Sequence, residues 1–282
     1  MSEPLPEDWM AWVRLNVSRG CTRESMVEMI VQGGHTEAQA HGAIDEASGV
    51  TAGPRLPTQA PHPRPQPRVD GNTVEIDGHA IRVALEVERP HVVVYENLLD
   101  DAECAALIVL ADQRLSRSTV VDDDSGGLKE HVDRTSAGGF FACGENELIT
   151  AVEARIAALL NWPVSHGEGL QVLRYTAGGE YKAHFDFFDP DKPGGVVHMA
   201  RGGQRVGTLV MYLSDVEAGG ATHFPKLGLH VRPRRGSAVY FENTDARGAV
   251  LPNSLHAGAP VLSGVKYIAT KWLREHAYGV QA

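Results

Sequence analysis

The sequence predicts an α+β fold in which helices come first and an antiparallel sandwich or barrel follows. Helical periodicity dominates residues 1–50 and 100–160, whereas short apolar runs between Gly, Pro, Asp and Asn turns continue from about residue 168 almost to the end. The strand patterns do not alternate with helices, which argues against a parallel sheet. Six of the sixteen prolines lie within residues 54–67, a composition typical of an extended linker. We therefore expect a small helical domain (1–50), a Pro-rich linker (51–69) and a larger domain (70–282).

Residues 1–50 predict three short helices. Apolar residues recur at helical spacing from Trp9 and from Met26, Gly33-Gly34 ends the second helix, and Thr36 with Gln39 forms a capping box at the start of the third. About 45 residues can close only a marginal core, so we expect this domain to bind a partner or the larger domain. Its role stays open, because no catalytic pattern lies in it.

The larger domain begins with a predicted strand at residues 91–95. A helix follows from the capping box of Asp100 and Glu103, and a second amphipathic helix is predicted over 145–160. The predicted strands after these helices cover 170–175, 208–213, 237–241 and 265–272.

Composition argues against several classes of partner. The chain has 26 Lys and Arg against 36 Asp and Glu, a formal charge of -10, which repels nucleic acids and anionic membranes. The sequence shows no secretory signal pattern and no apolar run of about 18 residues, so we expect a cytoplasmic protein. Its three cysteines, Cys21, Cys104 and Cys143, form no CxxC pair, and we expect them to be buried apolar side chains.

His184 and Asp186 form the first candidate metal-ligand pair. In an extended strand, side chains two residues apart leave on the same face, so both can reach one ion. His256 offers a second imidazole, and two histidines with one carboxylate are typical of non-haem Fe(II) sites. In a chain with 13 histidines, a His-x-Asp pair alone also arises by chance.

Lys266 follows His256 by ten residues across a turn. Two antiparallel strands joined there would place its ammonium deeper in the same cavity, where a buried lysine needs an anion. A dicarboxylate that chelates the metal at its other end would supply one. A solvated surface lysine is the alternative interpretation.

Several separated motifs together resemble the prolyl 4-hydroxylase branch of the 2-oxoglutarate/Fe(II)-dependent dioxygenases. The resemblance spans residues 90 to 275, and its motifs stand in the family's order at Leu170–Tyr175, His184-x-Asp186, Gly219–Pro225, Ser254–His256 and Gly264–Trp272. It implies a double-stranded β-helix (jelly-roll) core with supporting helices.

The resemblance also implies residue roles. His184, Asp186 and His256 match the iron ligands. Lys266, Tyr175 and Thr222 match positions that bind the distal carboxylate of 2-oxoglutarate. Four further positions match the substrate groove of peptide hydroxylases, where an arginine fork would bind peptide carbonyls and an aromatic face would pack on the proline ring: Arg134, Ser136, Arg205 and Trp272.

The function implied is hydroxylation of a prolyl residue in a peptide or protein, with decarboxylation of 2-oxoglutarate to succinate. Fe(II), 2-oxoglutarate and O2 would be required, with ascorbate as reductant. Asp186 favours hydroxylation over halogenation, and the loop expected over residues 189–203 is a candidate lid. Ala221 and Tyr267 depart from the usual family pattern, which leaves the substrate open.

Two other functions fit the same residues. A hydroxylase of a free amino acid or other small molecule would use the same metal ligands in a closed pocket. A catalytically idle β-barrel that serves as an interaction module would keep the fold alone.

Overall fold

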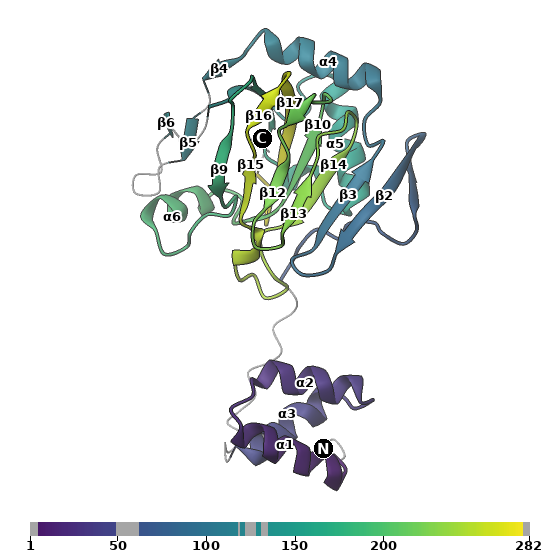
Figure 1. Ribbon diagram of the computed structural model, residues 1–282, viewed down its shortest axis with the longest axis vertical. Helices are drawn as coiled ribbons and strands as arrows, with labels where there is room; N and C mark the ends of the chain where they lie inside the picture. The colour runs from purple at the N-terminus through teal and green to yellow at the C-terminus, as the bar shows by residue number, and fades with distance from the viewer. Residues whose placement is uncertain (1–4, 49–61, 118, 122–127, 131–134, 279–282) are drawn as a thin grey trace. The chain divides into compact units, whose positions relative to one another are not determined.

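The computed structural model describes residues 5–48, 62–117, 119–121, 128–130 and 135–278 (Figure 1). Contacts divide the chain into two units, Met1–Ala60 and Pro61–Ala282, which we describe separately. Among the helices described, none combines the length and hydropathy that a bilayer-spanning segment needs.

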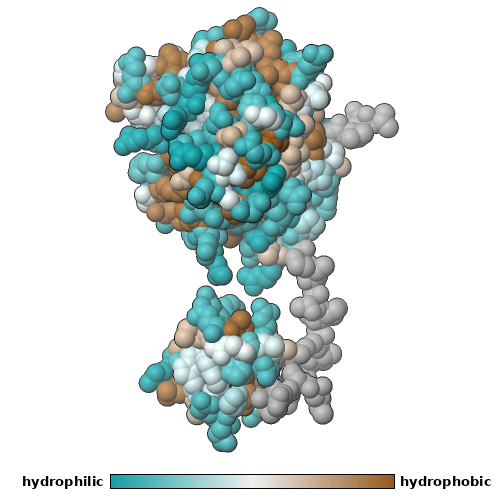
Figure 2. Space-filling model, turned by 90° about the vertical axis from the view of Figure 1, so that its right-hand side faces the viewer, coloured by the Kyte–Doolittle hydropathy of each residue, from teal (hydrophilic) through white to brown (hydrophobic). Residues whose placement is uncertain are grey.

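The first unit consists of α1 (Glu7–Ser18), α2 (Arg23–Gln32) and α3 (Glu37–Ala47). The Thr22 hydroxyl caps α2, and Thr36 forms the predicted capping box with Gln39 at α3. All three helices contribute to a small apolar core made of Leu5, Met10, Val13, Met26, Ile30, Ala40, Ala43 and Ile44. On the face shown in Figure 2 the unit is mainly hydrophilic, with small separate hydrophobic patches.

Two antiparallel sheets form the second unit, as the predicted jelly-roll fold requires. The larger has the strand order β1 (Thr73–Ile76), β2 (His79–Val87), β3 (Val92–Glu96), β14 (Ala238–Glu242), β10 (Arg205–Tyr212), β17 (Lys266–Arg274), β8 (Leu170–Tyr175), β7 (Ala137–Phe141) and β4 (Ser116–Arg117). The smaller has the order β13 (Leu229–Val231), β12 (Thr222–Phe224), β15 (His256–Gly258) and β9 (Tyr181–His184). Two further pairs join β11 (Ala218–Gly219) to β16 (Val261–Ser263) and β5 (Thr119–Val121) to β6 (Leu128–Glu130).

Alternation along the strands creates two apolar layers. On β10, Leu209 and Met211 pack towards the helices α4 (Asp101–Asp112) and α5 (Glu147–Leu160), which cover the outer face of the larger sheet (Figure 1). Val210 and Tyr212 point the other way, into the core between the two sheets. The capping box predicted at Asp100 and Glu103 begins α4.

β17 uses the same alternation to build a cavity wall. Its even-numbered residues, Lys266, Ile268, Thr270, Trp272 and Arg274, line a cavity of about 980 Å³ between the sheets. Its odd-numbered residues face the helices, with Ala269 and Leu273 in the outer core. The strand β17 therefore lines the cavity along its whole length, from Lys266 to Arg274.

The hairpin that we expected between His256 and Lys266 is not formed. β15 pairs with β9 and β12 in the smaller sheet, whereas β17 pairs with β10 and β8 in the larger one. The intervening β16 pairs with β11 instead. The two side chains nevertheless reach the same cavity, because they belong to facing sheets.

Three smaller expectations also need correction. Residues 62–69, assigned to the linker, lie on the second unit, where the amides of Gln66 and Arg68 bond to the end of α5. Only Cys104 is buried, and Cys21 and Cys143 are exposed. The loop expected over 189–203 contains a helix, α6 (Pro193–Met199).

Candidate active site

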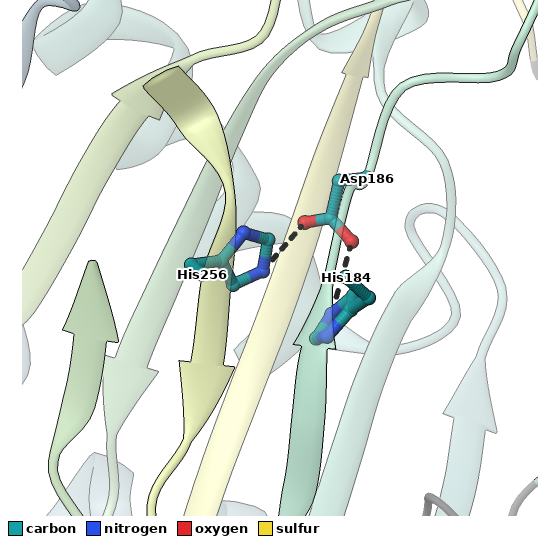
Figure 3. Close-up of side chains that lie close together, drawn as sticks. All are labelled: His184, Asp186 and His256. Atoms are coloured by element: carbon teal, nitrogen blue, oxygen red, sulfur yellow. Dashed lines mark ion pairs between the residues drawn. The ribbon is translucent and has the colours of Figure 1, made fainter. Parts of the chain in front are cut away.

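Two strand ends of the smaller sheet bring His184, Asp186 and His256 together (Figure 3). His184 ends β9 and lies opposite His256, the first residue of β15, while Asp186 follows two residues after β9 ends. The Asp186 oxygens lie 3.8 Å from Nε2 of His184 and 3.6 Å from Nε2 of His256. These gaps are too long for hydrogen bonds, yet the three ligand atoms all lie within 4.8 Å of one another.

Backbone carbonyls fix the orientation of both imidazoles. Nδ1 of His184 lies 2.7 Å from the carbonyl oxygen of Lys182, and Nδ1 of His256 lies 2.9 Å from that of Ser254. A carbonyl can only accept, so each Nδ1 carries a proton there and each Nε2 is turned towards Asp186. Two imidazoles and one carboxylate are ligands that fit a divalent iron.

Asp186 is held in place from the larger sheet. The Thr208 hydroxyl on β10 donates to its Oδ2 at 2.9 Å, and the Asn243 side-chain amide donates to the Thr208 oxygen at 3.0 Å. Burial alone would raise the pKa of Asp186, but His256, His184 and Arg205 together hold that pKa below its usual value. The carboxylate is therefore ionised and oriented for metal binding.

We expect Thr208→Val to weaken Fe(II) binding by about 10- to 100-fold, because the variant keeps the side-chain shape and removes only the bond that orients Asp186. Titration of the protein with Fe(II) or Mn(II) measures the effect. Thr270→Val, on the neighbouring strand β17 and without a described bond to Asp186, is the matched control. Equal metal affinity in wild type and Thr208→Val would contradict this role.

Lys266 lies in the same cavity as the three ligands. Its side chain comes from β17, is 2% exposed, and has its Nζ 5.5 Å from the centre of the Tyr175 ring on the paired strand β8. In the part of the chain that the structure describes, no carboxylate pairs with this ammonium, and burial lowers its pKa from 10.5 to about 8. The distal carboxylate of a dicarboxylate ligand would supply an anion for this buried ammonium.

Thr222 also lines this part of the cavity. Its hydroxyl oxygen accepts from Tyr212 at 2.6 Å, which leaves its own hydrogen free to donate to a ligand. Lys266, Tyr175 and Thr222 thus lie near one another at one end of the cavity. The residues present fit both Fe(II) and 2-oxoglutarate.

Arg205 and Trp272 line the other part of the cavity. Glu168 occupies the arginine fork, with Nε–Oε1 and Nη2–Oε2 distances of 2.6 and 2.8 Å. Those N–H groups are therefore not available to a peptide, contrary to our expectation from the sequence. The guanidinium stacks 4.0 Å from the Trp272 ring. Ser136 is buried and is not among the described residues that line the cavity, and Arg134 lies outside the described residues.

Sequence reasoning missed four polar residues of the site. Glu168 pairs with Arg205, Thr208 orients Asp186, Gln204 bonds to both backbone groups of Phe188, and Arg274 contacts Glu168. The period-2 series from Lys266 to Trp272 could have identified Arg274, which is the next residue on that face of β17. Glu168 and Gln204 carry no such local signal.

Comparisons with known proteins agree with this geometry. The family described as "2OG-Fe(II) oxygenase superfamily" matches residues 170–274. The chain is 40% identical over 210 residues to two Arabidopsis thaliana proteins, "Probable prolyl 4-hydroxylase 3" and "Prolyl 4-hydroxylase 5", covering 68% of this chain and 71% and 70% of theirs. The solved "viral collagen prolyl hydroxylase" of Paramecium Bursaria Chlorella virus-1 in its 2OG complex has a TM-score of 0.52 and 30% identity, over 65% of this chain and 95% of that one.

The chain therefore belongs to the 2OG-Fe(II) oxygenase superfamily and, within it, to the prolyl 4-hydroxylases. It is an enzyme of the dioxygenase class, which uses Fe(II) as cofactor and 2-oxoglutarate and O2 as co-substrates.

Proposed function

We propose that this enzyme hydroxylates a prolyl residue within a peptide or protein and decarboxylates 2-oxoglutarate to succinate. The supporting observation is one cavity of about 980 Å³ that the three ligands share with two chemically different groups of residues. Lys266, Tyr175 and Thr222 offer a cation and hydroxyl groups at one end. Trp272 and Phe188 offer aromatic surface at the other.

Each group of residues has a distinct task in this reaction. His184, Asp186 and His256 would hold Fe(II), while Lys266 and Thr222 would bind the distal carboxylate of 2-oxoglutarate and so fix its orientation. When bound, iron and 2-oxoglutarate supply the oxidative chemistry that transfers one oxygen atom of O2 to a C–H bond. The enclosing sheets exclude water from the buried Lys266 and Asp186 and thereby strengthen both charge interactions.

The mouth of the cavity favours a peptide over a free amino acid. Phe140 and Phe185 line it and remain 59% and 38% exposed, so they offer apolar surface to residues on either side of the reacting proline. The Trp272 indole N–H is buried without a hydrogen-bond partner among the described residues, and it can donate to a peptide carbonyl. Free proline would leave most of this surface unused.

The decisive experiment supplies the protein with Fe(II), 2-oxoglutarate and either proline-containing peptides or free proline. We expect peptides to accelerate succinate formation and to gain one oxygen atom by mass spectrometry. Hydroxylation of free proline alone would establish the small-molecule alternative. Absence of succinate with every substrate would favour the idle module.

Phe140→Ala tests the peptide interpretation separately. We expect the KM for a peptide to rise about 5- to 10-fold, because truncation of a contact aromatic costs on the order of 1 kcal/mol or more, while the KM for 2-oxoglutarate stays unchanged. Val109→Ala on α4 is the control, because Val109 is equally exposed, at 60% against 59%, and lies outside the cavity. An unchanged peptide KM in Phe140→Ala would contradict the proposal.

Three further features belong to this proposal. Ascorbate would act as reductant. The cellular site would be the cytoplasm, which agrees with three cysteines that are all free. The three-helix unit would form a separate domain that binds a partner, joined by a Pro-rich linker to the dioxygenase domain.

A further inference from the structure

Arg274 is the last residue of β17 and a buried charge that neither the metal nor the 2-oxoglutarate end of the cavity explains. It is 1% exposed and lines the cavity beside Trp272 and Arg205. Its Nη1 lies 3.2 Å from Oε1 of Glu168, and its Nη2 donates to the carbonyl oxygens of His198, at 2.6 Å, and Arg201. Three acceptors from two different segments thus meet one guanidinium.

Two of these acceptors belong to the segment 189–203, which forms one wall of the cavity. Asp189, Lys192, Gly195 and His198 line the cavity from this segment. Its helix, α6, buries only Gly194 and Gly195, and its two valines, Val196 and Val197, are 55% and 60% exposed. Because no apolar side chain of α6 is buried, the helix depends on polar contacts and on the stacking of the His198 ring on Phe188.

The third acceptor connects the same guanidinium to the metal ligands. Glu168 accepts from Arg274 and holds the fork of Arg205, whose Nη1 donates to the Asp186 carbonyl oxygen at 3.4 Å. Burial alone would raise the pKa of Glu168, but Arg205 and Arg274 hold that pKa below its usual value, so the carboxylate stays ionised. A continuous set of contacts therefore runs from α6 through Arg274, Glu168 and Arg205 to Asp186.

We propose that Arg274 is a positioning residue that holds the 189–203 segment against the substrate end of the cavity and so couples peptide binding to hydroxylation. This inference rests on the proposed function for its substrate. The planar guanidinium can serve three acceptors in different directions at once, which a single ammonium on a flexible stem does less well. Loss of these bonds would loosen α6 while leaving the Lys266 end of the cavity intact.

The test compares Arg274→Lys and Arg274→Gln with Arg155→Lys. Arg155 is a matched control, because like Arg274 it is a buried arginine, 4% exposed, that binds a glutamate and a backbone carbonyl. It pairs with Glu103 through two bonds at 2.8 Å and donates to the Leu98 carbonyl. Unlike Arg274, it lies outside the cavity. Hydrogen–deuterium exchange of the amides of residues 194–203 is measured without added metal. We expect exchange about tenfold faster in both Arg274 variants and unchanged in Arg155→Lys, as the loss of one or two hydrogen bonds implies.

Kinetics supply the second readout. We expect the KM for a proline-containing peptide to rise about tenfold and the ratio of succinate to hydroxylated peptide to increase, with the KM for 2-oxoglutarate within about twofold of wild type. Unchanged exchange in the 194–203 segment, or the same kinetic change in Arg155→Lys, would overturn the inference. If wild type oxidises no prolyl peptide, the proposed function fails, whereas the exchange measurement still decides whether Arg274 holds α6.

Discussion

His256→Ala is expected to abolish 2-oxoglutarate turnover, and we expect the same for His184→Ala and Asp186→Ala. Removal of a direct ligand leaves two of the three metal-binding groups, so the loss of activity should exceed the roughly 10- to 100-fold expected for an outer partner such as Thr208. The fold should survive, because His256 lies at a strand end and its neighbours Phe224 and Phe241 remain packed in the core between the sheets. Succinate formation and Fe(II) binding measure the effect.

His230→Ala is the control for this prediction. His230 also lies on the smaller sheet, but it is exposed, stacks on His223 and is not among the described residues that line the cavity. Turnover should equal that of wild type. Full activity in His256→Ala would show that the three converging side chains are not the metal site.

Lys266→Ala is expected to raise the dissociation constant of 2-oxoglutarate about 30-fold or more. Loss of one partner from a buried charge pair costs on the order of 2–5 kcal/mol, and each 1.4 kcal/mol is about tenfold in affinity. Fe(II) affinity should change little, because Lys266 contacts Tyr175 and Tyr212 rather than the three ligands. Equal 2-oxoglutarate affinity in wild type and variant would mean that another cation binds the carboxylate.

The role of Lys266 also predicts how the dissociation constant of 2-oxoglutarate changes with pH. Burial lowers the Lys266 pKa to about 8, so the ligand-free protein loses the ammonium as pH rises through that value. The dissociation constant of 2-oxoglutarate should be flat below about pH 8 and rise about tenfold per unit above it, because only the protonated form attracts the carboxylate. Lys266→Arg keeps its charge and should show no such rise in the same range.

Local patterns predicted the elements of the fold better than their pairing. The capping boxes at Thr36 and Asp100 and the strand at 170–175 are all present where the sequence places them. The predicted hairpin from His256 to Lys266 failed, because pairing depends on contacts between distant segments: β15 joins β9, 72 residues earlier at the paired histidines. Short turn signals cannot distinguish a hairpin from a connection between two sheets.

In the active site, too, the sequence identifies some residues and not others. His184, Asp186 and His256 converge as predicted, since metal ligands have distinctive residue types. The polar partners around them have no such signature: Thr208 and Asn243 are ordinary strand and turn residues whose role appears only when the two sheets face each other. Arg205 was placed in the right cavity, but its partner Glu168 could not be inferred from the intervening sequence.

The alternation of β17 has a consequence for how this enzyme can diversify. Point substitutions at Trp272 or Arg274 alter one end of the cavity and leave Lys266, at the other end of the same strand, untouched. A one-residue insertion or deletion inside the strand changes the cavity along the strand beyond that point. It shifts the register, so that residues of the cavity face and of the helix face exchange places. Lys271, whose ammonium pairs with the buried Glu153 of α5, would then be forced towards the cavity. Changes of length should therefore accumulate in the loops around this strand, whereas substrate preference evolves by exchange of single residues within it.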